Sequence, residues 1–201
     1  GLVDCDVGRS TFDFAVFAGH KTLYGPTGIS GFVMKPDINL PPVLFGGTGY
    51  DSANQDMPDS LPEKYEMGTS NIAGIAGLNA ALQWNQKIAI QNIFEREQKN
   101  RKKLLEILSQ YDFITIVGNA PTQQYVGIVS CLFDGISSDI AGSLLSEHGV
   151  SVRTGLQCAP LAHKFLGTYP AGTIRFSVGY FTSEEDYNGL TNALDYIDQN
   201  I

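Results

Sequence analysis

Cysteine, methionine and tryptophan are all scarce in this chain of 201 residues, which has three cysteines, three methionines and one tryptophan. The cysteines are Cys5, Cys131 and Cys158, and no two of them have CxxC spacing. An odd number of widely spaced cysteines argues against a disulfide framework and against a zinc site. We therefore expect no bound metal and a reducing compartment, the cytoplasm.

Positive charge and long apolar runs are also in short supply. The chain has 13 Lys and Arg against 21 Asp and Glu, a net charge of -8. Nucleic-acid and anionic-membrane surfaces need clustered basic residues, so we expect neither partner. The one basic run, residues 96–103, is strongly helical, and we expect it to be a solvated helix face. No stretch approaches the roughly 20 apolar residues of a membrane span, and no signal peptide is present.

What is present in the first half is a strand pair, a long loop and a helix. Apolar residues 12–18 and 29–34 predict two strands around a glycine-rich turn. Residues 36–62 hold five of the nine prolines and have no periodicity, which predicts a functional or subunit-spanning loop. A helix is expected from Ser70 or Asn71, either of which can cap it, through residue 88, and it resumes over residues 90–108.

From about residue 112 the pattern becomes βαβ-like. Strands are expected over 113–117, 126–133, 150–153 and 173–178. One helix should start at Ser137 or Ser138, and a last helix should start at the Thr-Ser-Glu-Glu run of residues 182–185. Strands with helices on one face predict a small α+β lobe within an α/β protein. Cys131 lies inside an apolar strand and is expected to be a core thiol.

Lys21 is the first candidate for chemistry. An apolar strand delivers it into the turn GHKTLYGPTG at residues 19–28. A lysine in such a site can lose its proton near neutral pH and attack an aldehyde, forming a Schiff base. His20 beside it is either a neighbour of a cofactor phosphate or a core histidine. Thr69 lies where the first helix starts, and free N–H groups there can bind a phosphate, although a plain structural cap is the commoner outcome.

Three residues of the second half are candidates for substrate chemistry. Cys158 lies in a loop with glycine, proline, Arg153 and a histidine, which suits an exposed thiol with a favoured thiolate; an inert cysteine is the alternative. Arg175 is charged between apolar strand residues, so it needs an anionic partner. That partner is either a substrate carboxylate or an internal Asp or Glu.

Five segments in order resemble the class V aminotransferases, a group of pyridoxal-phosphate enzymes, and within it the cysteine desulfurase family. The cysteine loop is similar to the branch with RTGLQCAPLAHK. The segments are FAGHKTLYGPTGISGFVM at 17–34, FGGTG at 45–49, YEMGTSNIAGIAGLNAAL at 65–82, VRTGLQCAPLAHKFLG at 152–167 and GTIRFSVGYFTSEED at 172–186.

The resemblance implies a fold and a cofactor. The fold would be the C-terminal part of a PLP-dependent transferase of the aspartate aminotransferase type. Residues 1–90 would be a remnant of the large PLP-binding domain with the lysine loop, and residues 91–201 the small α+β domain. Lys21 matches the lysine that holds pyridoxal 5'-phosphate through a Schiff base and moves the substrate Cα proton. His20 matches a residue beside the phosphate, and Thr69 one that reaches the phosphate of the neighbouring subunit.

The resemblance also implies a reaction. Cys158 matches the nucleophile that takes sulfur from L-cysteine as a persulfide, which a sulfur-acceptor protein could then receive. Arg175 matches the arginine that grips the substrate carboxylate, and Arg153 a second arginine near the active site. A homodimer is implied as well. A selenocysteine lyase and a class V aminotransferase remain open, and Ala18, where many relatives have serine, leaves the exact substrate open.

One part of the family pattern does not match any residues here. Relatives carry, before the lysine, a phosphate loop, an aromatic residue stacked on the cofactor and an aspartate paired with the pyridine nitrogen, and only 20 residues precede Lys21. We therefore expect the C-terminal portion of the enzyme. A non-catalytic fragment that serves in folding or dimerisation is the alternative from another functional class. A glycine-rich nucleotide site is disfavoured, because neither glycine run has the required spacing.

Overall fold

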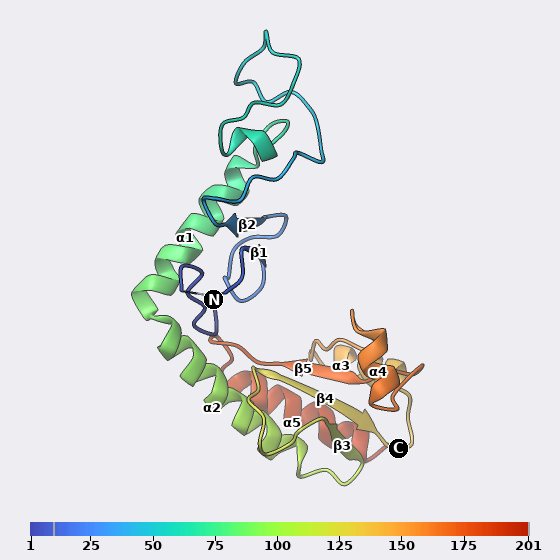
Figure 1. The fold of residues 1–201 in the computed structure, drawn as a ribbon. Coiled ribbons are helices and arrows are strands. Elements are labelled where there is room, and N and C mark those ends of the chain that lie inside the picture. Colours follow the sequence, from blue (N-terminus) through green and yellow to red (C-terminus); the bar gives the residue numbers. More distant parts are fainter. Residues whose placement is uncertain (10, 201) are drawn as a thin grey trace. The chain divides into compact units, whose positions relative to one another are not determined.

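The computed structural model describes residues 1–9 and 11–200. Its chain forms two compact units, unit 1 (Gly1–Gln91) and unit 2 (Asn92–Ile201), and each is described by itself (Figure 1). Across the described residues, no helix combines the length and the apolar character needed to cross a membrane. Nor do these residues contain a group of three or more His, Cys, Asp or Glu side chains that could hold a metal ion.

Unit 1 begins with the predicted strand pair. β1 (Phe14–Ala18) and β2 (Ser30–Met34) are antiparallel, with a register that runs from the pair Phe14 and Met34 to the pair Ala18 and Ser30. The long proline-rich segment that follows has, among its described residues, only the short 3-10 helix η1 (Glu63–Tyr65) before the next helix. Both strands and the long loop are therefore as the sequence predicts.

Helix α1 (Ile72–Ile88) completes unit 1. Of the two caps that the sequence allowed, Asn71 is the one used: its Oδ1 accepts a hydrogen bond from the backbone N–H of Gly74 at 3.0 Å. This bond satisfies one of the N–H groups that a helix leaves unpaired in its first turn.

Unit 2 is a three-stranded sheet with helices. The sheet order is β3 (Ile114–Val117), β4 (Ile128–Phe133) and β5 (Ile174–Ser177), and all neighbours are antiparallel. The helices are α2 (Ile90–Leu108, which starts two residues before the unit boundary), α3 (Ser138–Glu147), α4 (Pro160–Phe165) and α5 (Glu184–Asp198). The α+β lobe is confirmed, but the βαβ-like pattern is not, because that pattern implies parallel strands.

One of the four strands expected in this half is absent from the described residues. Of the segment 150–153, only Arg153 pairs with the sheet, through an isolated antiparallel bridge to Arg175. The segment is bounded by Gly149 and Gly155, both with positive φ, so the backbone turns toward and away from the free edge of β5 within a few residues. Its apolar content alone gave no sign of this.

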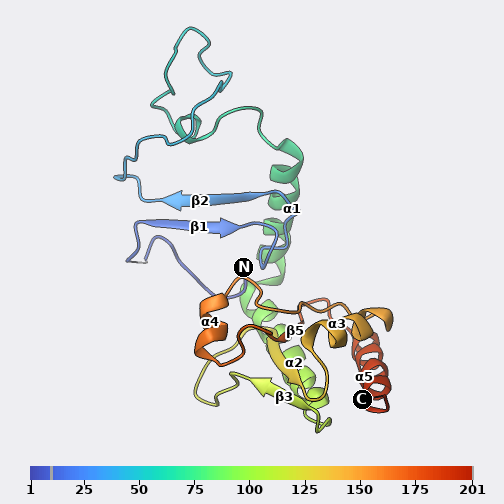
Figure 2. The same cartoon turned by 90° about the vertical axis from the view of Figure 1, so that its right-hand side faces the viewer.

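One face of the sheet forms the core of unit 2. Alternate residues Val129, Cys131 and Phe133 of β4 are buried, together with Ile174 and Phe176 of β5. Side chains of α2, α3 and α5 pack against them, so these helices cover this face (Figure 2). Burial raises the pKa of the Cys131 thiol to about 12, which confirms it as a core cysteine and not a reactive one.

The basic run on α2 is solvated on one side of the helix. Glu97, Asn100 and Arg101 are buried, although Lys99 and Lys102 are exposed as expected. The Arg101 guanidinium donates to Asn119 Oδ1 at 2.8 Å. The exposed Arg96, Lys99 and Lys102 thus form the expected solvated face. Arg101 is the buried exception, because residues three or four positions apart, such as Glu97 and Arg101, share the inner side of the helix.

Candidate active site

Lys21 lies in a turn that hydrogen bonds close at both ends. β1 ends at Ala18, and the N–H of the buried Gly19 donates to the carbonyl of Ile29 at 3.0 Å. The N–H of Gly25 donates back to the carbonyl of Gly19 at 2.8 Å. A Cβ on Gly25 would lie 2.7 Å from that carbonyl oxygen, so the turn needs glycine there. Lys21 itself is exposed.

Helix α1 holds this turn from one side. Asn71 Nδ2 donates to the carbonyl of Gly28 at 3.2 Å, and Asn85 Nδ2 donates to the carbonyl of Leu23 at 2.9 Å. Asn85 is buried. The sequence did not mark Asn85 as a positioning residue; its polar side chain within the apolar period of the helix is the signal that could have found it.

The other two candidates of unit 1 lie at the surface. His20 shares the turn with Lys21 and is exposed, so it is not a core histidine. Thr69 precedes α1 and is also exposed. The N–H of Gly68, next to Thr69, donates to the carbonyl of Gly47 at 2.7 Å, which anchors this segment to the glycine run of the long loop.

In unit 2, the cysteine loop starts at Arg153, which forms an antiparallel bridge with Arg175 of β5. Each backbone N–H donates to the other residue's carbonyl, at 3.1 Å from Arg153 and 2.8 Å from Arg175. The loop then passes close to the residues that precede β5. A Cβ on Gly172 would lie 2.1 Å from the backbone of Gly155. Cys158 is exposed at the end of this loop, just before α4.

The histidine of the cysteine loop makes its ring hydrogen bonds with residues other than Cys158. His163 is buried, and both of its ring nitrogens have partners. Nε2 contacts Gln157 Oε1 at 2.9 Å, and Nδ1 contacts Thr168 Oγ1 at 2.7 Å. His163 therefore supports the loop from inside and is not placed to take a proton from Cys158.

Arg175 lies on the face of β5 opposite to the core. It is half-buried and opposes Ser130 of β4 in the register, whereas the neighbouring Ile174 and Phe176 point into the core. Its Nε is buried and has no hydrogen-bond partner among the described residues. Since those residues also supply no carboxylate within ion-pair distance of Arg175, the internal Asp or Glu considered as its partner is not found there. The side chain of Arg153 is exposed.

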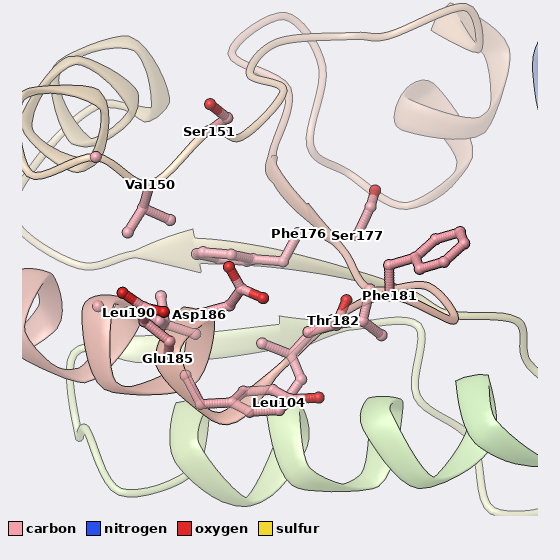
Figure 3. A pocket seen from close by; sticks show the side chains of 14 residues that line it. Leu104, Val150, Ser151, Phe176, Ser177, Phe181, Thr182, Glu185, Asp186 and Leu190 are labelled. Atoms are coloured by element: carbon pink, nitrogen blue, oxygen red, sulfur yellow. The ribbon is translucent and has the colours of Figure 1, made fainter.

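A separate hollow of about 550 Å³ in unit 2 contains none of these candidates (Figure 3). It lies beside the end of β5 and the start of α5, and its lining includes Phe176 and Leu190 together with the acidic Glu185 and Asp186. None of the predicted site residues lines it. The chemistry-bearing residues are thus at the Lys21 turn in unit 1 and along the free edge of β5 in unit 2.

Comparison with known proteins identifies the family of this chain. Residues 3–190 match the model of the aminotransferase class-V family. The chain belongs to this family. A probable cysteine desulfurase of Methanothermobacter thermautotrophicus is 32% identical over 203 residues, which covers 98% of this chain and 50% of the relative.

Solved structures of relatives have the same fold. The apo structure of the cysteine desulfurase from Thermococcus onnurineus NA1 matches with a TM-score of 0.80 and 29% identity, over 94% of this chain and 48% of that one. A variant of the cystine lyase C-DES with glycine covalently linked to the PLP cofactor matches with a TM-score of 0.74 and 25% identity, over 94% of this chain and 47% of that one. The chain spans about half the length of these class-V relatives, and its fold is the corresponding α/β part of a PLP-dependent enzyme.

The donors of unit 1 fit the cofactor that the class-V family implies. Lys21 offers an exposed primary amine, the group that condenses with an aldehyde. His20 and the hydroxyl of Thr69 are exposed donors suited to a phosphate, and Thr69 lies just ahead of the positive end of the 17-residue helix α1. The set therefore matches the aldehyde and the phosphate of pyridoxal 5'-phosphate.

Proposed function

We propose that this chain carries the lysine, cysteine and arginine of a pyridoxal-phosphate-dependent cysteine desulfurase. The observation that supports this most is the exposed Cys158 on a loop tied by backbone hydrogen bonds to the strand of Arg175. A class V aminotransferase needs no thiol at that place. A selenocysteine lyase would use the same elements, and it is the alternative substrate choice within this class.

In this proposal, unit 1 is the remnant of the cofactor domain. Lys21 would hold pyridoxal 5'-phosphate and would move the substrate Cα proton on its amine, His20 would bind the phosphate, and Thr69 would bind the phosphate of the neighbouring subunit. When bound, the cofactor would supply an electron sink for the amino-acid substrate. The closed turn and the bonds from Asn71 and Asn85 hold Lys21 at a defined place for this work.

Unit 2 is the small domain that binds and desulfurates the amino acid. Arg175 binds the substrate carboxylate, and its buried, unpartnered Nε supports this role, because a guanidinium without an anion is an unsatisfied donor. Arg153, held to Arg175 by the strand bridge, adds positive charge at the same edge.

Cys158 is the nucleophile for sulfur. Its thiolate forms an S–S bond with the substrate sulfur while the C–S bond breaks, and the electron pair of that bond stays on the substrate carbon, which takes up a proton. L-Cysteine thus becomes alanine and Cys158 becomes a persulfide, with no added oxidant or reductant. Because Cys158 is exposed, a sulfur-acceptor protein in the cytoplasm could reach the persulfide.

A homodimer is part of the same proposal. Unit 1 exposes large apolar side chains such as Val16, Phe45 and Ile72, and an exposed apolar surface of this kind is typical of one that is covered in an assembly. Thr69, also exposed, would then serve the phosphate site of the neighbouring subunit.

Replacing Cys158 tests the function. Cys158→Ala in the protein that carries this chain, loaded with pyridoxal 5'-phosphate, should abolish sulfide release from L-cysteine and leave the visible absorbance of the bound cofactor intact. Cys5→Ala, at another exposed cysteine, is the matched control and should keep full activity. Unchanged sulfide release in Cys158→Ala would overturn the proposal.

A non-catalytic module is the second candidate, favoured by the exposure of Lys21, His20 and Thr69 in this chain. Without further walls, such a site binds the cofactor weakly. We expect the isolated chain to develop little absorbance of bound cofactor when pyridoxal 5'-phosphate is added. A strong band that is lost in Lys21→Ala but kept in Lys87→Ala would contradict the module and favour a competent site.

A further inference from the structure

The residue before Cys158 has an unusual backbone. Gln157 has a φ of 48°, in the left-handed region that residues other than glycine rarely adopt. Such a conformation persists only where the surrounding structure enforces it, and it is concentrated at functional sites. Something must therefore hold Gln157 in place, and Cys158 follows directly from it.

The side chain of Gln157 shows what holds it. Its Nε2 donates to the carbonyls of Thr173 at 3.3 Å and Arg153 at 3.5 Å, and its Oε1 contacts His163 Nε2 at 2.9 Å. Thr173 is buried and precedes β5, so the amide joins the cysteine loop to the two segments that carry the arginines.

The hydrogen-bond directions set the role of Nε2 of His163. Because Gln157 Nε2 is committed to carbonyl acceptors, its Oε1 faces the histidine and can only accept. His163 Nε2 therefore donates to Gln157 Oε1, and His163 Nδ1 lies 2.7 Å from Thr168 Oγ1, whose hydroxyl also donates to the His163 carbonyl at 3.4 Å. Each member of the chain Thr168, His163, Gln157 orients the next.

A cavity next to these hydrogen bonds explains why the loop depends on them. A cavity of about 390 Å³ is lined by Gln157, His163 and Thr173, together with apolar residues such as Val117 and Ile128 on the outer face of the sheet. Packing does not fill this space, so the loop would be free to shift into it without the polar contacts.

We infer that Gln157 and His163 are positioning residues that hold the Cys158 loop in its left-handed turn and in register with the strand of Arg175. The inference rests on the proposed function of Cys158 as the sulfur nucleophile. Neither residue touches the reacting atoms; they set the direction in which the thiol leaves the loop.

Two substitutions of His163 separate positioning from mere packing. His163→Asn keeps a polar group at the Nδ1 position for Thr168 but loses the donor to Gln157, whereas His163→Gln places an amide N–H at the Nε2 position. In the cofactor-loaded protein, we expect His163→Asn to slow first-turnover persulfide formation on Cys158 by about 10²-fold, since small misplacements have effects of that size. His163→Gln should recover most of this loss.

Two controls accompany the pair. The change in cofactor absorbance on adding L-cysteine, which reports Lys21 and not the loop, should be the same in both variants as in the wild type. His148→Asn, on the C-cap of α3, should leave persulfide formation unchanged. Equal rates in His163→Asn and His163→Gln would overturn the inference.

Gln157→Gly covers the case in which a histidine variant does not fold. Glycine adopts positive φ without strain, so this variant keeps the turn but lacks the amide. We expect a similar loss of first-turnover rate with an unchanged thermal midpoint, and a wild-type rate would overturn the positioning role. If the wild type itself forms no persulfide on Cys158, the proposed function fails instead, so the two failures are distinguishable.

Discussion

Unit 1 and unit 2 bury their apolar residues very differently. Unit 2 has a continuous core in which Leu104, Leu145, Ile174 and Leu194 are almost completely buried. Among the described residues of unit 1, Leu2 is the only hydrophobic side chain that is buried. Unit 2 thus has the driving force for folding within itself, and unit 1 relies on hydrogen-bonded turns and one helix. Lys21, the proposed cofactor lysine, lies in the unit with little core, and Cys158, the proposed sulfur nucleophile, lies in the unit that has one.

The largest expected effect is on independent folding. Residues 92–201 alone should unfold in a cooperative transition with urea, because their core lies entirely within that range. Residues 1–91 alone should show no cooperative transition in the same experiment. Circular dichroism of the two pieces measures both transitions. A sharp transition in residues 1–91 would show that unit 1 also folds by itself.

A matched pair of truncations tests the contrast within the intact chain. Leu194→Ala in α5 should lower the free energy of unfolding by about 2–5 kcal/mol, because its side chain is 0% exposed. Val16→Ala in β1, where the side chain is 74% exposed, should change it by less than about 0.5 kcal/mol. Chemical denaturation measures both, and similar losses would show that unit 1 is packed as tightly as unit 2.

The smallest expected effect concerns a charge buried in unit 2. Burial raises the pKa of Glu97, and the hydrogen bond from the Gly127 N–H, at 2.6 Å, opposes the rise only in part. The folded state then holds the proton more tightly than the unfolded one, so stability is greatest below the unfolded pKa and falls as the pH rises through the folded pKa.

Unfolding measured between pH 4 and 8 checks this direction. Glu97→Gln keeps an acceptor for Gly127 and should flatten that decline, whereas Glu106→Gln, at an exposed position on the same helix, should leave it unchanged. A decline that persists in Glu97→Gln would assign the pH dependence to another group.

Much of the fold could be predicted because its signals are local. The apolar runs of β1, β2 and β4, the cap of α3 by Ser137 and the capping box of α5 at Ser183 all depend on residues close in sequence. The failed strand over residues 150–153 was apolar enough, but strand formation needs a partner along its whole length. Only the folded backbone, which turns at Gly149 and Gly155, shows that this segment pairs with β5 at a single residue, Arg153.

The candidate site shows the same division. The motifs around Lys21, Cys158 and Arg175 indicated the family, and comparison with relatives confirmed it. His163 was expected near the thiol because it lies five residues from Cys158 in the sequence, yet it is buried against Gln157 and Thr168. The one turn of α4 between them rotates it inward, which sequence distance does not show.

The sequence by itself determined the family and the α+β character of the second half, and it selected Lys21, Cys158 and Arg175 as the candidate site residues, because these depend on residue type and order. The tertiary structure decided that the sheet is antiparallel, that Arg175 has a buried Nε without a partner, and that Gln157 is held by His163 and two backbone carbonyls. These features join residues through space. Burial and hydrogen-bond direction, which decide their chemistry, arise only when the chain has folded.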